Sequence, residues 1–123
     1  MRALAKKAAI DVRGIRARYL AVALLAAVSA TAFAQEVVVF KLVAKDGRFT
    51  PPNLEVPAGK RIKIEISNEG TTPIEFESKP LKQEKVLAPG AKSSVTINPL
   101  KPGEYPFFDE FHPDTSRGKI TAR

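Results

Sequence analysis

The sequence predicts an all-β fold, an antiparallel sandwich of about eight short strands. All ten prolines follow residue 50, where they separate short apolar runs. Residues 61–66 alternate strictly between charged residues and isoleucines, as a half-buried strand does. Residues 35–123 carry no convincing helical pattern. Many short strands joined by turns at this spacing are typical of a β-sandwich.

The first 34 residues form a separate compositional block. Basic residues come first, an apolar run follows over residues 19–28, and small residues close the block with Ala32-Phe33-Ala34. This order is the pattern of a cleaved secretory signal, so we expect a signal over residues 1–34 and a single domain over residues 35–123 in the periplasm. An uncleaved anchor is the competing interpretation, but the apolar run of about ten residues is half of what a spanning helix needs.

Removing the signal changes the charge balance. The whole chain carries 20 Lys and Arg against 13 Asp and Glu, but six of the bases and one acid lie in the first 34 residues. The other 14 bases and 12 acids leave a formal charge near +2, so a nucleic-acid-binding role loses its main support. The absence of cysteine excludes disulfides and metal–thiolate sites. We therefore expect a domain of about 89 residues without stable membrane insertion.

Turn residues mark the ends of the predicted strands in the first half of the chain. Residues 36–44 are rich in valine and form the first strand. Residues 54–56 form a short strand between the turns Pro51-Pro52-Asn53 and Pro57-Ala58-Gly59. In residues 61–66, the isoleucines face the core and the charged residues face water.

Five further strands complete the two sheets. They are predicted over residues 74–78, 84–87, 93–97, 104–110 and 119–122. The third of these follows the Pro89-Gly90 turn. A short helical turn fits residues 113–117, between the last two strands.

The first group of residues with chemical potential is Glu75-Phe76-Glu77. Because residues two apart on a strand point the same way, both carboxylates emerge on one face while Phe76 enters the other. Two neighbouring carboxylates repel each other, so either a positive group lies nearby or one of the two is protonated. Either Lys79 and Lys82 neutralise them on a solvated face, or the carboxylates bind a cation.

The second group is Asp109-Glu110-Phe111-His112. Extended geometry would place Glu110 and His112 on one side with Phe111 opposite, although the next residue is a proline, which marks the end of a strand. A lone histidine is most often a surface or core residue. Together with carboxylates, it forms a ligand set suited to iron, copper(II), manganese or zinc.

Other residues receive structural interpretations. The aromatic residues are interpreted as packing residues rather than as a stacking platform, and they are Phe40, Phe49, Tyr105, Phe107, Phe108 and Phe111. A hydrolase is disfavoured, because the sequence shows no nucleophile motif and no phosphate-binding glycine loop, and little chain remains to build a cleft.

Several segments resemble the cupredoxins in order and spacing. They are residues 49–60, the isoleucine strand ending at Asn68, and Pro102-Gly103-Glu104-Tyr105. The resemblance implies a cupredoxin-like Greek-key β-sandwich. It also puts Asp109 where the family has its copper-binding cysteine and His112 where it has a histidine, with no methionine after them. A blue-copper centre needs that thiolate, so the fold is expected without the blue-copper site.

A closer resemblance is to the EfeO-type cupredoxin-like group of periplasmic iron-uptake systems. The most specific segments are residues 75–78, 81–86 and 107–115. The resemblance implies a small periplasmic protein that binds iron or copper at an acid-rich site. Its partner would be an iron permease or a companion iron-uptake protein, and its role ferrous iron oxidation, electron transfer or iron delivery. The candidate metal ligands are Glu75, Glu77, Asp109, Glu110 and His112.

Two functions from different classes follow from the sequence. The preferred one is a periplasmic metal-binding protein that assists iron uptake. The competitor is a metal-free cupredoxin-fold adaptor that docks a membrane permease through its acidic residues, and a copper carrier is a third. Metal binding requires two segments about 30 residues apart to converge on one ion, which the sandwich fold would allow.

Overall fold

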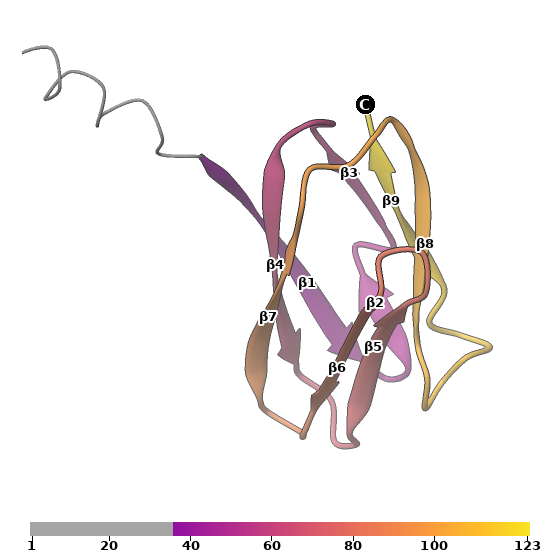
Figure 1. Cartoon of the computed structure of the whole chain (residues 1–123). Coiled ribbons are helices and arrows are strands. Elements are labelled where there is room, and N and C mark those ends of the chain that lie inside the picture. Colours follow the sequence, from indigo (N-terminus) through magenta and orange to yellow (C-terminus); the bar gives the residue numbers. More distant parts are fainter. Residues whose placement is uncertain (1–35) are drawn as a thin grey trace, which may run out of the picture. The chain divides into compact units, whose positions relative to one another are not determined.

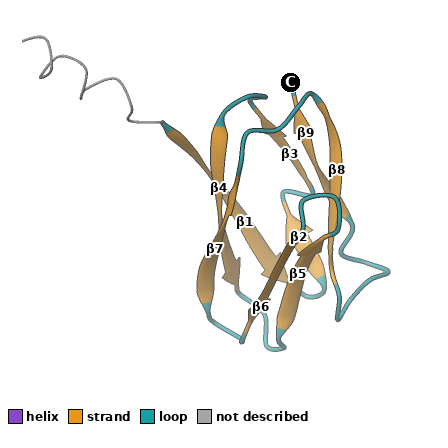
Figure 2. Cartoon of the chain, viewed as in Figure 1, coloured by secondary structure: helices purple, strands orange, loops and turns teal. Residues whose placement is uncertain are grey.

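A computed structural model describes residues 36–123, which form a sandwich of two sheets (Figure 1). The predicted signal over residues 1–34 lies outside the described residues. The predicted β-sandwich is confirmed, and the described part contains nine strands and no helix that could span a membrane (Figure 2). The strands are β1 (Val37–Lys45), β2 (Arg48–Thr50), β3 (Asn53–Val56), β4 (Arg61–Asn68), β5 (Ile74–Ser78), β6 (Gln83–Leu87), β7 (Lys92–Ile97), β8 (Gly103–Asp109) and β9 (Gly118–Ala122).

The chain divides its strands between a four-stranded and a five-stranded sheet. The order is β2-β1-β4-β7 in the first sheet and β3-β9-β8-β5-β6 in the second. Most neighbours are antiparallel as predicted, but β1 pairs with β4 and β3 pairs with β9 in parallel. The chain visits the opposite sheet between the members of each parallel pair. A strand that returns after such a crossover can run in the same direction as its neighbour.

Strand β2 is the one strand within residues 36–123 that the sequence does not predict. Lys45 pairs with Arg48 across a two-residue loop, and both loop residues have positive φ, 51° at Asp46 and 70° at Gly47. Asp-Gly is the residue pair that such a hairpin turn favours. At residues 113–117, the Ser116 N–H donates to the His112 carbonyl at 3.2 Å, which closes a single turn without forming a helix.

The core lies between the inner faces of the two sheets. The isoleucines of β4 face inward as predicted, and Phe49, Phe76 and Phe107 meet at its centre with ring centroids 5.3 to 5.9 Å apart. Phe49 and Phe107 therefore pack as predicted. Phe111 does not, because 52% of it is exposed.

Candidate metal-binding site

Strand β5 presents its glutamates on the outer face of the five-stranded sheet. Ile74, Phe76 and Ser78 are buried, whereas Glu75 and Glu77 are half-exposed. The predicted alternation is therefore correct. Phe76 is fully buried in the core, so it fixes which way the two carboxylates point.

Asp109, the last residue of β8, is buried and accepts three hydrogen bonds through its carboxylate. Its Oδ1 accepts the Glu75 backbone N–H at 2.9 Å and the Phe111 N–H at 3.0 Å. Its Oδ2 lies 2.7 Å from His112 Nδ1. Only 2% of the residue is exposed. Both oxygens are therefore used inside the protein, which is how a buried carboxylate avoids the cost of desolvation.

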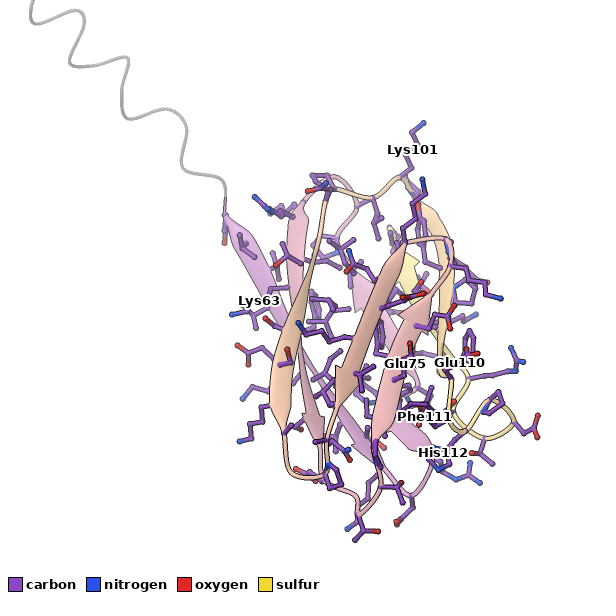
Figure 3. All side chains as sticks on the ribbon, turned by 60° about the horizontal axis from the view of Figure 1, so that its bottom comes forward. Lys63, Glu75, Lys101, Glu110, Phe111 and His112 are labelled. Carbon is purple, nitrogen blue, oxygen red and sulfur yellow. The ribbon has the colours of Figure 1, made fainter. Side chains whose placement is uncertain are left out.

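The chain turns sharply after Asp109, and this turn changes where the next side chains lie. The His112 N–H donates to the Asp109 carbonyl at 3.0 Å, so the extended geometry considered for Glu110 and His112 does not continue. Figure 3 shows Glu110 beside Glu75, with Phe111 and His112 farther along the loop. The strand therefore ends here, as the following proline suggested, and the extended alternation considered for Glu110 and His112 does not apply.

The His112 ring packs between Asp109 and the β1–β2 turn. A Cβ at Gly47 would lie 3.1 Å from His112 Cδ2, and the Thr115 hydroxyl donates to the Gly47 carbonyl at 2.6 Å. Because a carboxylate only accepts hydrogen bonds, the contact with Asp109 assigns the proton to His112 Nδ1. The side chain is 32% exposed, and Nε2 is its remaining nitrogen for a metal.

Glu77 and Glu110 are brought to the same face of the sheet by two different segments. The Glu110 N–H donates to the Glu75 carbonyl at 3.0 Å, which holds the loop against β5. The Glu110 carboxyl lies within hydrogen-bonding reach of Glu77 and raises the pKa of Glu77, aided by partial desolvation and by like charge. Lys79 opposes this increase and Glu84 adds to it.

Glu84 is an acid of this surface that the sequence analysis did not include. It lies directly opposite Glu77 in the antiparallel β5–β6 pair, so both side chains emerge on the same face. The signal was the hairpin register: the turn over residues 79–82 pairs Ser78 with Gln83 and therefore Glu77 with Glu84. Val86, which lies opposite Glu75, is 59% exposed on this face.

Four of the five predicted ligands thus form two separate pairs, and the backbone of the fifth, Glu75, links the pairs. Glu110 raises the pKa of Glu77, whereas Asp109 contacts His112. Within residues 36–123, no group of three or more His, Asp or Glu side chains is gathered closely enough to hold a metal ion. The two segments do converge, but not around one shared centre.

Comparison with known proteins agrees with this architecture. The profile of the cupredoxin-like domain family matches residues 18–122. RP394, an uncharacterized protein of Rickettsia prowazekii, is 41% identical over 80 residues, which are 65% of this chain and 64% of that protein. The matched part therefore spans less than two thirds of that relative.

Several solved structures share the sandwich. Auracyanin A, a blue copper protein of Chloroflexus aurantiacus, is 14% identical, and the match covers 72% of this chain and all of auracyanin A, with a TM-score of 0.61. The metal-binding domain of the Cu(I)-exporting ATPase CopA of Streptococcus pneumoniae is 13% identical, and the match covers 73% of this chain and 98% of that domain, with a TM-score of 0.62. At these identities the likeness shows the fold alone.

Proposed function

Because the chain belongs to the cupredoxin-like domain family, we propose that it is an exported protein that binds an iron or copper ion at the Glu77–Glu110 pair and delivers it to a membrane permease or a companion periplasmic protein. Two similar folds, auracyanin A and the CopA domain solved with Cu(I), are copper proteins, which supports a metal-handling role. The resemblance of residues 75–78, 81–86 and 107–115 to the EfeO-type group supports iron uptake as the setting.

One observation carries this proposal: Glu110 pairs with the Glu75 backbone on the face that carries Glu77, and its carboxyl raises the pKa of Glu77. A hydrogen bond with the Glu110 carboxyl, followed by desolvation and like charge, raises the pKa of Glu77, so the neutral form of Glu77 is favoured beside Glu110. Such an arrangement disfavours the doubly ionised free protein. A cation bound between the carboxyls would remove the repulsion, so metal binding converts an unfavourable contact into a favourable one.

The residues present do not suit a thiolate copper centre. Cysteine is absent, and Asp109, at the expected cysteine position, already accepts three hydrogen bonds. His112 directs Nδ1 toward Asp109. Copper bound here would therefore lack the sulfur ligand that gives blue-copper sites their electron-transfer properties.

The carboxyl pair does suit a hard cation. Carboxylate oxygens are ligands for iron and copper(II) as well as for other divalent ions. Two protein ligands leave the remaining coordination positions to water or to groups of a partner. A site of this kind binds weakly and exchanges readily, which suits delivery better than storage.

The other candidate residues would support the site in different ways. Glu75 lies on the same face as Glu77 and adds negative charge near the ion. Asp109 would hold the loop that carries Glu110 rather than bind metal. His112 would offer only Nε2, from the far side of that loop.

A metal titration tests the function. Copper(II) and ferric citrate are added separately to the purified protein, and the melting temperature and the binding heat are measured. We expect a rise in melting temperature that the double variant Glu77→Gln, Glu110→Gln abolishes. The control is Glu65→Gln, Glu69→Gln, which removes the same charge outside this pair and should keep the rise.

The outcomes separate the candidate functions. No rise in the unmodified protein, or equal loss in both double variants, would contradict metal binding at Glu77–Glu110. The metal-free adaptor would then be favoured, and the Asp109–His112 bond supports that alternative because it closes the loop without an ion. A strong preference for copper(II) over iron would favour a copper carrier.

A further inference from the structure

The outer face of the four-stranded sheet gathers basic side chains. Every second side chain of β1, β2, β4 and β7 points outward. These side chains share one face, because residues paired across neighbouring strands point the same way. The basic residues among them are Lys41, Lys45, Arg48, Arg61, Lys63 and Lys92. The outward acid on these strands is Glu65, 3.8 Å from Lys63. We call this surface the basic face.

Valine side chains lie among these charges. Val37 is 40% exposed and Val39 is 50% exposed, and they lie opposite Arg61 and Lys63. An open hollow of about 590 Å³ lies on this face, and its charged lining residues are the bases Lys41, Lys63 and Lys92 and the acids Glu65 and Glu69. The basic face is therefore a broad positive surface with small apolar side chains in it.

The opposite side of the sandwich carries the opposite charge. The outward residues of β5 and β6 and the first residue after β8 include Glu75, Glu77, Glu84 and Glu110. Figure 3 shows Lys63 on one side of the sandwich and Glu75 and Glu110 on the other. A nearly neutral domain thus has two faces of opposite sign, which orients it in the field of a charged surface.

We propose that the basic face docks the protein onto an anionic phospholipid membrane surface. Several Lys and Arg side chains on one face are attracted by acidic headgroups, and exposed apolar side chains between them can enter the interfacial region. The outward residues of β1, β4 and β7 include no aromatic side chain, whereas protein interfaces concentrate their binding energy in buried aromatic anchors. A flat surface of spread charges and valines matches a membrane better than a protein partner.

This docking would set the orientation of the whole domain. With the basic face on the lipid, the Glu77–Glu110 pair on the opposite sheet is directed away from the bilayer, toward a companion periplasmic protein rather than a membrane permease. The inference does not depend on what that pair binds, so it can hold whether or not the protein carries metal.

Vesicle sedimentation tests the docking. The full chain is mixed with vesicles of phosphatidylcholine alone, or with vesicles containing an equal share of phosphatidylglycerol, at about 50 and about 500 mM salt. We expect stronger binding to the phosphatidylglycerol vesicles that falls as salt screens the charges. Lys41→Glu, Lys63→Glu should weaken that binding at least about tenfold.

The matched control is Lys79→Glu, Lys101→Glu, which changes the net charge equally but alters exposed residues outside the basic face. It should retain most of the binding, and any contribution of residues 1–35 is common to both double variants. Lys41→Gln, Lys63→Gln serves as a milder variant if charge reversal lowers the melting temperature. A Val39→Ser variant should lose binding that persists at high salt.

Three results would overturn the proposal. Equal weakening by the two reversal pairs would mean that only net charge matters. Complete displacement from vesicles by millimolar glycerol 3-phosphate would indicate a small-anion site instead. Self-association without vesicles that only Lys41→Glu, Lys63→Glu abolishes would assign the basic face to the acidic face of a second copy.

Discussion

Asp109 Oδ2 lies 2.7 Å from His112 Nδ1, while Oδ1 of the same carboxylate accepts the Glu75 N–H from the neighbouring strand. One buried side chain thus connects the end of β8, the loop that follows it and the start of β5. Asp109 stands where the family resemblance implies a metal-binding cysteine. Its hydrogen bonds therefore hold these three segments together without a metal ion.

Replacing Asp109 by alanine should destabilise the fold by about 2–4 kcal/mol. The change leaves N–H groups of Glu75 and Phe111 without their acceptor and removes the partner of His112. Chemical denaturation measures the loss. Asp114→Ala, in the same loop but exposed, should stay within about 0.5 kcal/mol of the unmodified protein. Similar losses in both variants would contradict the role given to Asp109.

The Asp109–His112 bond should also appear as an energetic coupling. In a double-mutant cycle with Asp109→Ala and His112→Ala, the double variant should lose about 1–2 kcal/mol less stability than the sum of the two single losses. The reason is that either change alone already breaks the same contact. Denaturation of the four proteins gives the coupling. A cycle that pairs Asp109→Ala with Lys101→Ala provides the additive reference. Additive losses in the first cycle would mean that the two side chains act independently.

Gly118 begins β9 at a position with no room for a side chain. A Cβ there would meet the Pro52 carbonyl oxygen and would lie 2.6 Å from Phe107 Cζ. Gly118→Ala should therefore destabilise by about 1–3 kcal/mol, since backbone or a core ring must move. Gly70→Ala is the comparison, because its nearest neighbour would be 3.4 Å away. Equal losses of melting temperature in the two variants would contradict the tight packing around Gly118.

Local patterns were enough to predict most of the fold. Two strands show this, residues 61–66 with their alternating isoleucines and residues 74–78 with Phe76 between two glutamates. Each strand buries only one face, so every second side chain points inward. Strand β2 was missed although Asp46-Gly47 is a strong hairpin signal, because only three residues follow it before Pro51. Such a short strand carries almost no periodicity.

The site was harder to predict, because its geometry depends on bonds between distant segments. In the β5–β8 pair Glu77 lies opposite Phe108, and Glu110 bonds to the Glu75 backbone, so Glu77 and Glu110 are diagonal neighbours on one face. The burial of Asp109 and the outward turn of Phe111 follow from a carboxylate that accepts one backbone N–H from its own loop and one from β5. Nothing in the local pattern separates such a residue from an exposed acid, so Asp109 and Glu110 looked alike in the sequence.

The contact between Glu77 and Glu110 makes a prediction about pH. Because Glu110 raises the folded-state pKa of Glu77 above its unfolded value, the folded protein binds more protons than the unfolded chain in the intervening range, and stability falls as pH rises through it. Glu77→Gln removes this penalty. The variant should melt higher than the unmodified protein at about pH 7, and the advantage should shrink as the pH falls and vanish once Glu77 is protonated in both states, near pH 4 or below.

The matched variant for this pH series is Glu65→Gln, on the other sheet and beside Lys63 rather than a second carboxylate. Removing the Glu65 charge removes its attraction to Lys63, so this variant is not expected to be more stable than the unmodified protein at neutral pH. Melting curves of the three proteins across the pH range distinguish a local carboxyl contact from a general effect of net charge. If both variants gained the same stability at neutral pH, the gain would reflect overall charge. The carboxyl pair would then lose its place as the cation site.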